Sequence, residues 1–114
     1  TAIVVAKSVV CSPLLKCAMF GADANWGRVL CAVGYAPAEF DINQVAVTLA
    51  SRAGSVDVCR NGAGIEFSED IAKKVLLEDE IEILVSVGDG PAEATAWGCD
   101  LTYDYVKING DYRS

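Results

Sequence analysis

Residues 81–87 read Ile-Glu-Ile-Leu-Val-Ser-Val, with an apolar side chain at every odd-numbered position. Side chains of a strand point alternately to its two faces, so this stretch predicts a strand with one apolar face. Residues 88–91, Gly-Asp-Gly-Pro, have the composition of a turn. Residues 92–101 are therefore expected to return as a paired strand. The chain must contain a sheet, and the other segments must pack on it.

Helical and extended patterns alternate along the rest of the chain. Helices are predicted at 2–11, at 26–36 with Asp23 or Asn25 as its cap, and at 69–77 with Ser68 as its cap. Strands are predicted at 14–20, at 44–50 and on either side of an Asn61-Gly62 turn within 56–67. One or two helical turns are expected in the tail. The expected fold is a single α+β domain over 1–114, with helices packed on a small mixed or mostly antiparallel sheet.

The most apolar stretch, residues 2–20, does not have the pattern of a membrane span. Lys7 and Lys16 interrupt it and Pro13 breaks it. A basic segment before it and a cleavage site after it, the marks of a signal peptide, are not evident in the sequence. The predicted helix opens abruptly, so we expect the chain to be a fragment of a longer protein.

Charge and residue usage exclude several classes of function. The net charge is −7 over 114 residues, which makes nucleic acid and anionic membranes poor partners. The sequence has no His, so a Ser-His-Asp or Cys-His centre within this chain is excluded. Five cysteines lie in apolar sequence without a Cys-x-x-Cys pair. We expect buried, reduced thiols in a cytosolic compartment, and neither a zinc site nor a cofactor.

The segment Gly21-Ala-Asp-Ala-Asn-Trp-Gly-Arg28 is the densest polar and aromatic cluster. A helix N-terminus beside Arg28 could bind a carboxylate. The segment could equally be a structural turn in which Asp23 and Asn25 bond the backbone, Trp26 packs, and Arg28 pairs with an acid. The Gly-rich stretches at 60–64 and 88–91 lack the Lys-Ser/Thr of a phosphate loop and are interpreted as turns.

Thr1 offers a second type of chemistry. An N-terminal Thr can act as a nucleophile with its own amine as base. Such a residue ordinarily begins a buried strand, whereas Lys7 and Ser8 give the following segment a helical pattern. An amidohydrolase using Thr1 is kept as an alternative function.

The tail is unusually rich in specific side chains for a chain end. Residues 95–114 read TAWGCDLTYDYVKINGDYRS, with Trp97, three tyrosines and alternating charges. Three stretches together resemble the C-terminal part of the glutamate N-acetyltransferases: SPLLKCAMFGADANWGRVLCAVGYA (12–36), EDEIEILVSVGDGPAEATAWGCDLTYDYVKIN (78–109) and the terminal YRS (112–114). That family is also called ornithine acetyltransferases, the bifunctional proteins of arginine biosynthesis.

The resemblance implies a cytoplasmic, self-cleaving acyltransferase. Its β chain begins with a nucleophilic Thr, which carries an acetyl group from N2-acetyl-ornithine to glutamate; some members also accept acetyl-CoA. Thr1-Ala-Ile-Val does not match the cleavage motif, so we expect the nucleophile outside this chain and no catalytic residue within it. The resemblance also implies partners: an α chain and the remainder of the β chain, in an αβ hetero-oligomer.

Two positions of the family's ending, Asn-x-x-x-x-Thr/Ser, transfer to this sequence. They are Asn109 and Ser114, which the resemblance implies contact the amino-acid substrate. The aromatic residues Trp97, Tyr103, Tyr105 and Tyr112 are expected to anchor the tail. The alternative is a non-catalytic assembly module that uses the acidic face and the tail to bind partner subunits.

Overall fold

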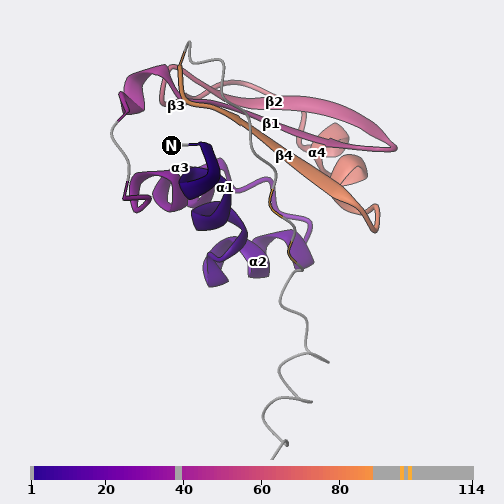
Figure 1. Ribbon diagram of the computed structural model, residues 1–114. Coiled ribbons are helices and arrows are strands. Elements are labelled where there is room, and N and C mark those ends of the chain that lie inside the picture. Colours follow the sequence, from indigo (N-terminus) through magenta and orange to yellow (C-terminus); the bar gives the residue numbers. More distant parts are fainter. Residues whose placement is uncertain (1, 38–39, 89–95, 97, 99–114) are drawn as a thin grey trace, which may run out of the picture.

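The computed structural model describes residues 2–37, 40–88, 96 and 98. In chain order the elements are α1 (Ala2–Val10), α2 (Pro13–Phe20), α3 (Trp26–Gly34), the short 3₁₀ helix η1 (Ile42–Gln44), β1 (Ala46–Ser51), β2 (Gly54–Arg60), β3 (Ala63–Gly64), α4 (Glu69–Leu76) and β4 (Ile81–Ser86). Figure 1 shows α1, α2 and α3 on one side of the sheet. The predicted α+β class, with helices on a small antiparallel sheet, is confirmed.

The four described strands pair in the order β3-β2-β1-β4, and every pairing is antiparallel. The register between β1 and β2 shifts once, because Val47 lies opposite Cys59 whereas Thr48 lies opposite Asp57. Val58 is therefore the extra residue of a β-bulge. As a result, Val58 and Cys59 are both buried although they are consecutive in the strand.

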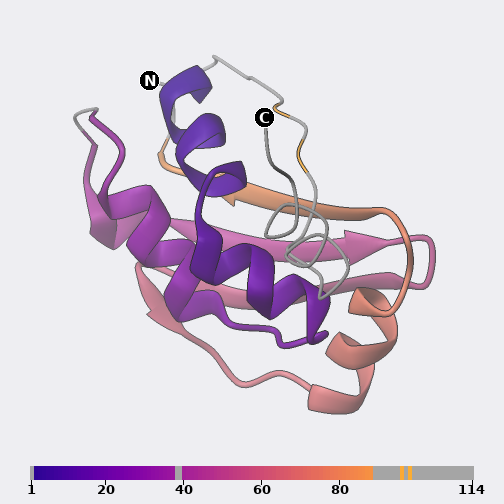
Figure 2. The ribbon, with the colours of Figure 1, turned by 90° about the horizontal axis from the view of Figure 1, so that it is seen from below.

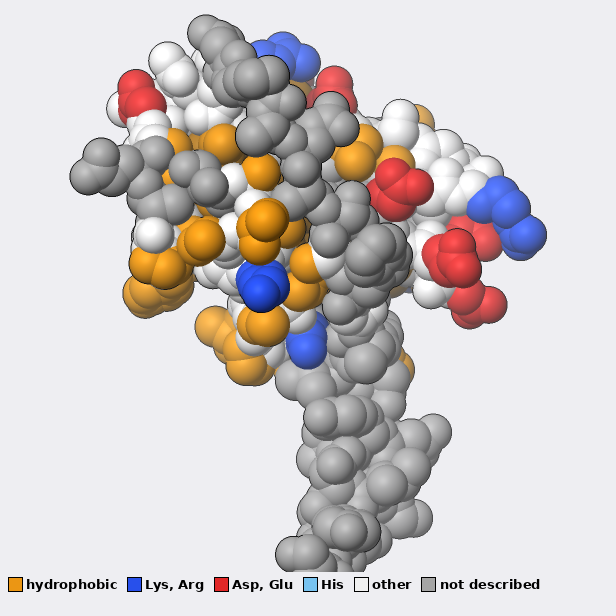
Figure 3. All heavy atoms as spheres, in the orientation of Figure 1, with side chains coloured by type: hydrophobic (Ala, Val, Ile, Leu, Met, Phe, Trp, Pro, Cys, Tyr) orange, Lys and Arg blue, Asp and Glu red, His pale blue; other side chains and the backbone are white. Residues whose placement is uncertain are grey.

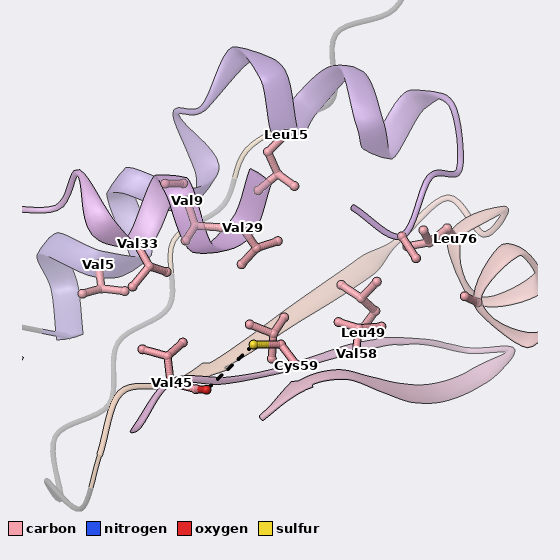
Figure 4. Packing of buried hydrophobic residues seen from close by; sticks show 14 of the residues in the cluster. Val5, Val9, Leu15, Val29, Val33, Val45, Leu49, Val58, Cys59 and Leu76 are labelled. Carbon is pink, nitrogen blue, oxygen red and sulfur yellow. Dashed lines mark hydrogen bonds between the residues drawn. The ribbon is translucent and has the colours of Figure 1, made fainter. Parts of the chain in front are cut away.

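The core lies between the sheet and the helices. Val45, Val47 and Leu49, at alternate positions in and just before β1, are at most 1% exposed. The helices add Val5, Val9, Leu15, Val29, Val33, Val75 and Leu76. Figure 4 shows the labelled helical side chains facing the strand residues Leu49, Val58 and Cys59. The odd-numbered residues of 81–87 pack at the border of the same cluster, which confirms the apolar face predicted for this strand.

Residues 14–20 are helical, so the strand predicted there is wrong. Ser12 caps α2, since its Oγ accepts a hydrogen bond from the Leu15 N–H at 3.3 Å. Pro13 occupies the first helical turn, where its lack of an N–H costs nothing and its fixed φ suits a helix. The Ser-Pro pair that ends α1 therefore also starts the next helix, and this local signal outweighs the apolar run that follows.

The other predicted elements within the described residues are confirmed, with ends shifted by a few residues. Ser68 caps α4 by accepting from the Ile71 N–H at 3.3 Å. Asn61 and Gly62 both have positive φ, 54° and 73°, as a tight hairpin turn requires. Gly62 also donates its N–H to the Val45 carbonyl at 2.8 Å, so this turn is tied to the chain entering β1.

Other expectations fall where the structure gives no description. They are the returning strand at 92–101, apart from Ala96 and Gly98, and the helical turns of the tail. Figure 2 gives the view from below, in which α1, α2 and α3 lie in front of the strands. Of the helices described, none alone is long and apolar enough to cross a membrane; α1 and α2 pass that test only as a pair, bent by 59° at Cys11–Ser12.

Candidate functional site

The segment 21–28 is built as a helix-capping turn. Asn25 caps α3, because its Oδ1 accepts a hydrogen bond from the Arg28 N–H at 3.1 Å. The Asn25 Nδ2 donates to Asp23 Oδ2 at 3.2 Å. The structural interpretation predicted that both side chains bond the backbone; Asn25 does so, whereas the Asp23 carboxylate bonds the Asn25 side chain.

Arg28 connects two helices. Its Nη1 donates to the Leu14 carbonyl of α2 at 2.8 Å. The sequence interpretation assigned Arg28 an acidic partner, but the described acids form ion pairs only with Arg52 and Arg60. Among the described residues the guanidinium instead meets a backbone oxygen in the first turn of α2. Arg28 thus fixes the position of α2 relative to α3.

Trp26 lies directly on Gly64 of β3. A Cβ at position 64 would stand 2.3 Å from the Trp26 Cζ2 atom and 2.5 Å from Cε2. The indole therefore occupies the space of the missing side chain, and it joins α3 to the short edge strand. Only the absence of a side chain at Gly64 permits this contact.

An open hollow of about 390 Å³ lies where α1, α2 and α3 meet. Its lining is largely apolar and includes Leu14 and Tyr35, which are 64% and 85% exposed. Ser8 and Ala32 also line the hollow, and the Ser8 hydroxyl donates a hydrogen bond to the Ala32 carbonyl. Figure 3 shows hydrophobic side chains gathered over the helical layer, with basic side chains among them.

An acidic pocket lies beside the turn between β1 and β2. Arg52 pairs with Glu78 there at 3.4 Å, and Asp79, Glu80 and Glu82 surround it in a volume of about 400 Å³. The Arg52 side chain is 90% exposed, so this ion pair stands in water and contributes little to stability. Asp79, Glu80 and Glu82 are exposed and form a solvated acidic face.

Three of the four cysteines in the described part of the chain are exposed, which corrects the expectation of buried thiols. Cys11, Cys17 and Cys31 lie on helical surfaces, whereas only Cys59 is in the core. Apolar neighbours in sequence did not imply burial, because successive residues of a helix point in different directions. Burial raises the pKa of the Cys59 thiol, and a hydrogen bond with the Gly62 backbone offsets part of this increase.

We therefore predict that Cys59 reacts most slowly with a thiol reagent at neutral pH. A raised pKa leaves less thiolate, and the core excludes the reagent. Peptide mass mapping of the folded complete protein should show Cys17 modified well before Cys59. Unfolding in denaturant should remove the difference. Equal rates in the folded protein would contradict the placement of Cys59.

The described residues form a scaffold and do not bring a catalytic group together. The structure shows no buried charged side chain in 2–37 and 40–88. Over the same described residues no three potential metal ligands cluster. The predicted substrate contacts Asn109 and Ser114 lie outside the described residues, as do Thr1 and the tail tyrosines. The sequence did not predict the contact of Gly64 with Trp26 or that of Arg28 with Leu14, because the partners are far apart in sequence.

Comparison with known proteins shows what this scaffold resembles. A model of the ArgJ family matches residues 1–114. The chain is 53% identical over 111 residues to "Arginine biosynthesis bifunctional protein ArgJ 1" of Clostridium acetobutylicum, covering 97% of this chain and 27% of that protein. It is 44% identical over 109 residues to "Glutamate N-acetyltransferase" of Methanopyrus kandleri, covering 96% of this chain and 28% of that protein.

A crystal structure has the same fold. The arginine biosynthesis bifunctional protein argJ of Bacillus halodurans superposes with a TM-score of 0.81 at 39% identity. The match covers 96% of this chain and 50% of that chain. This chain therefore spans a minor part of the length of the relatives that it matches.

Proposed function

This chain belongs to the ArgJ family, and we propose that it is the C-terminal portion of an N-acetyltransferase of arginine biosynthesis. The observation that carries the proposal is the match over 96–97% of the chain to relatives so named. The proposed reaction moves an acetyl group from N2-acetyl-ornithine to glutamate. Acetyl-CoA is a further candidate donor.

The proposed chemistry takes place at a threonine outside this chain. Its hydroxyl attacks the acetyl carbonyl of acetyl-ornithine, an ester forms, and ornithine leaves with the proton on its amine. The glutamate amine then attacks the ester and restores the hydroxyl. The described part of the chain supplies a rigid α+β support for this site.

The tail is proposed to orient the substrate. Asn109 offers an amide and Ser114 a hydroxyl, and each can bond the α-carboxylate or the amide nitrogen of either amino acid. Such contacts fix geometry and do not activate the acyl group. Ser114 keeps the hydroxyl of the commoner Thr but lacks its methyl group.

The proposed assembly is an αβ hetero-oligomer in the cytoplasm. It contains an α chain and the remainder of the β chain, which arise when a precursor cleaves itself before the catalytic threonine. The hydrophobic side chains over α1, α2 and α3 offer one surface on which such subunits can pack.

We predict that the complete protein catalyses acetyl exchange by a ping-pong mechanism. Double-reciprocal plots at several glutamate concentrations should be parallel, and labelled acetyl-ornithine alone should leave an acetyl group on one threonine. Intersecting lines, or no acetylated threonine, would contradict the proposal. A label on Thr1 of this chain would instead support the amidohydrolase alternative.

The assembly-module alternative makes a different prediction. If the tail only binds partner subunits, Asn109→Ala should leave both KM values unchanged while lowering the fraction of assembled enzyme. Size-exclusion chromatography beside steady-state kinetics separates these outcomes.

A further inference from the structure

The corner between α1 and α2, at residues 10–12, is held by backbone hydrogen bonds. The Cys11 N–H donates to the Lys7 carbonyl at 3.0 Å, and the Ser12 N–H donates to the Val9 carbonyl at 3.3 Å. Ser12 then caps α2 through Leu15. Consecutive hydrogen bonds on both sides of the bend leave little freedom in the path of the chain at Val10–Ser12.

Helix α3 holds this corner from two directions. On the α1 side, Ser8 bonds through its hydroxyl to the Ala32 carbonyl. On the α2 side, Arg28 donates to the Leu14 carbonyl at 2.8 Å. These two contacts fall just before and just after the corner. The corner is therefore fixed to the core through α3, whose Val29 and Val33 are at most 1% exposed.

Gly98 lies against this corner. A Cβ at position 98 would stand 3.2 Å from the Val10 Cβ and 3.4 Å from the Val10 carbonyl oxygen, closer than side chains ordinarily approach. Gly98 itself is exposed, so this contact adds little to the buried core. Its effect is on where the chain passes, because a side chain at position 98 would require Val10 or the chain itself to shift by a few tenths of an ångström.

We propose that Gly98, through its close approach to Val10 at the α1–α2 corner, is a positioning residue for the acetyl transfer. This rests on the proposed function, in which Asn109 and Ser114 contact the substrate. Asn109 follows Gly98 by eleven residues in the sequence. Gly98 precedes Asn109 and Ser114 in the sequence, so its contact with Val10 would fix the point from which the chain continues toward them. Arg28, which has no part in the proposed chemistry, acts by holding the corner in place.

The test is the kinetics of Gly98→Ala in the complete protein. The added methyl group should displace the chain from Val10 and raise the KM of acetyl-ornithine and of glutamate about fivefold each, with kcat changed less than about twofold. Gly98→Val should have a larger effect in the same direction. Both KM values should rise because one tail orients both substrates.

Matched variants separate positioning from a fault in folding. Gly34→Ala is the control, since nothing lies within 4 Å of a Cβ at position 34, and it should leave both KM values at wild type. Val10→Gly removes the Cβ that the new methyl meets, so in combination with Gly98→Ala it should return both KM values toward wild type. Arg28→Lys, which keeps the charge but has fewer donors, should reproduce the rise in KM in part.

Unchanged KM values in Gly98→Ala would overturn the proposal, as would a loss of kcat with a lowered unfolding temperature that Val10→Gly does not rescue. Asn109→Ala distinguishes this failure from failure of the proposed function. If Asn109→Ala raises both KM values and Gly98→Ala does not, only the positioning role of Gly98 is wrong. If Asn109→Ala also leaves them unchanged, the substrate role of the tail is wrong.

Discussion

Deletion of residues 109–114 from the complete protein should lower kcat/KM for acetyl transfer by about a hundredfold or more. The deletion removes Asn109 and Ser114 together, and hydrogen bonds to a charged substrate group contribute about 1.5–3 kcal/mol each. Two such bonds correspond to roughly a hundredfold or more in the specificity constant. Initial rates with acetyl-ornithine and glutamate measure the effect directly.

Single substitutions should divide this effect between the two residues. Asn109→Ala and Ser114→Ala should each reproduce part of the loss, whereas Ser114→Thr keeps the hydroxyl and should behave as wild type. Wild-type kinetics in the deleted protein would rule out a substrate role for the tail.

Gly64→Ala should destabilise the scaffold by about 3 kcal/mol, the upper end of the range for overpacking. A methyl group 2.3 Å from the Trp26 Cζ2 atom cannot be accommodated without moving either the indole or β3. Trp26 begins α3 and follows the Asn25 cap, so moving the indole disturbs the helix that holds the α1–α2 corner. Hydrogen exchange in the complete protein should show faster exchange in α3 and β3.

The same logic provides a rescue and a control for this substitution. Trp26→Phe replaces the two fused rings of the indole with one shorter ring, so adding it to Gly64→Ala should recover part of the lost protection. Gly34→Ala lies at the other end of α3 in open space and should change little. Unaltered exchange in Gly64→Ala would show that the contact between Trp26 and Gly64 does not hold α3 to the sheet.

Local signals were sufficient for most elements of this fold. Ser68 followed by two acids predicts α4, Asn61-Gly62 predicts the hairpin turn, and the alternation at 81–87 predicts β4. Residues 14–20 misled because a short apolar run fits a buried helix as well as a strand. The Ser12-Pro13 pair was interpreted only as the end of the preceding helix. It is also a signal for the start of the next one, α2.

The contacts that organise the candidate site were harder to predict. Arg28 and Leu14 are fourteen residues apart, and Trp26 and Gly64 lie on a helix and a strand that no local pattern pairs. The exposed cysteines show the same limit, since apolar sequence around Cys11, Cys17 and Cys31 did not reveal which way each thiol points. Asn109 and Ser114 came from family resemblance alone, because nothing in the chemistry of a single amide or hydroxyl identifies its ligand.

The bulge at Val58 has a consequence for anyone who compares or redesigns this strand. Before the bulge the inward-facing residues of β2 have even numbers, as at Val56 and Val58. After it the inward-facing residue is odd-numbered, namely Cys59. A sequence alignment that slips by a single residue here would exchange inside for outside at Cys59 and Arg60, the last two residues of the strand. A grafted segment of regular strand would likewise turn its apolar side chains to solvent beyond this point. The two consecutive buried residues, Val58 and Cys59, should therefore be used to align this strand with those of related chains.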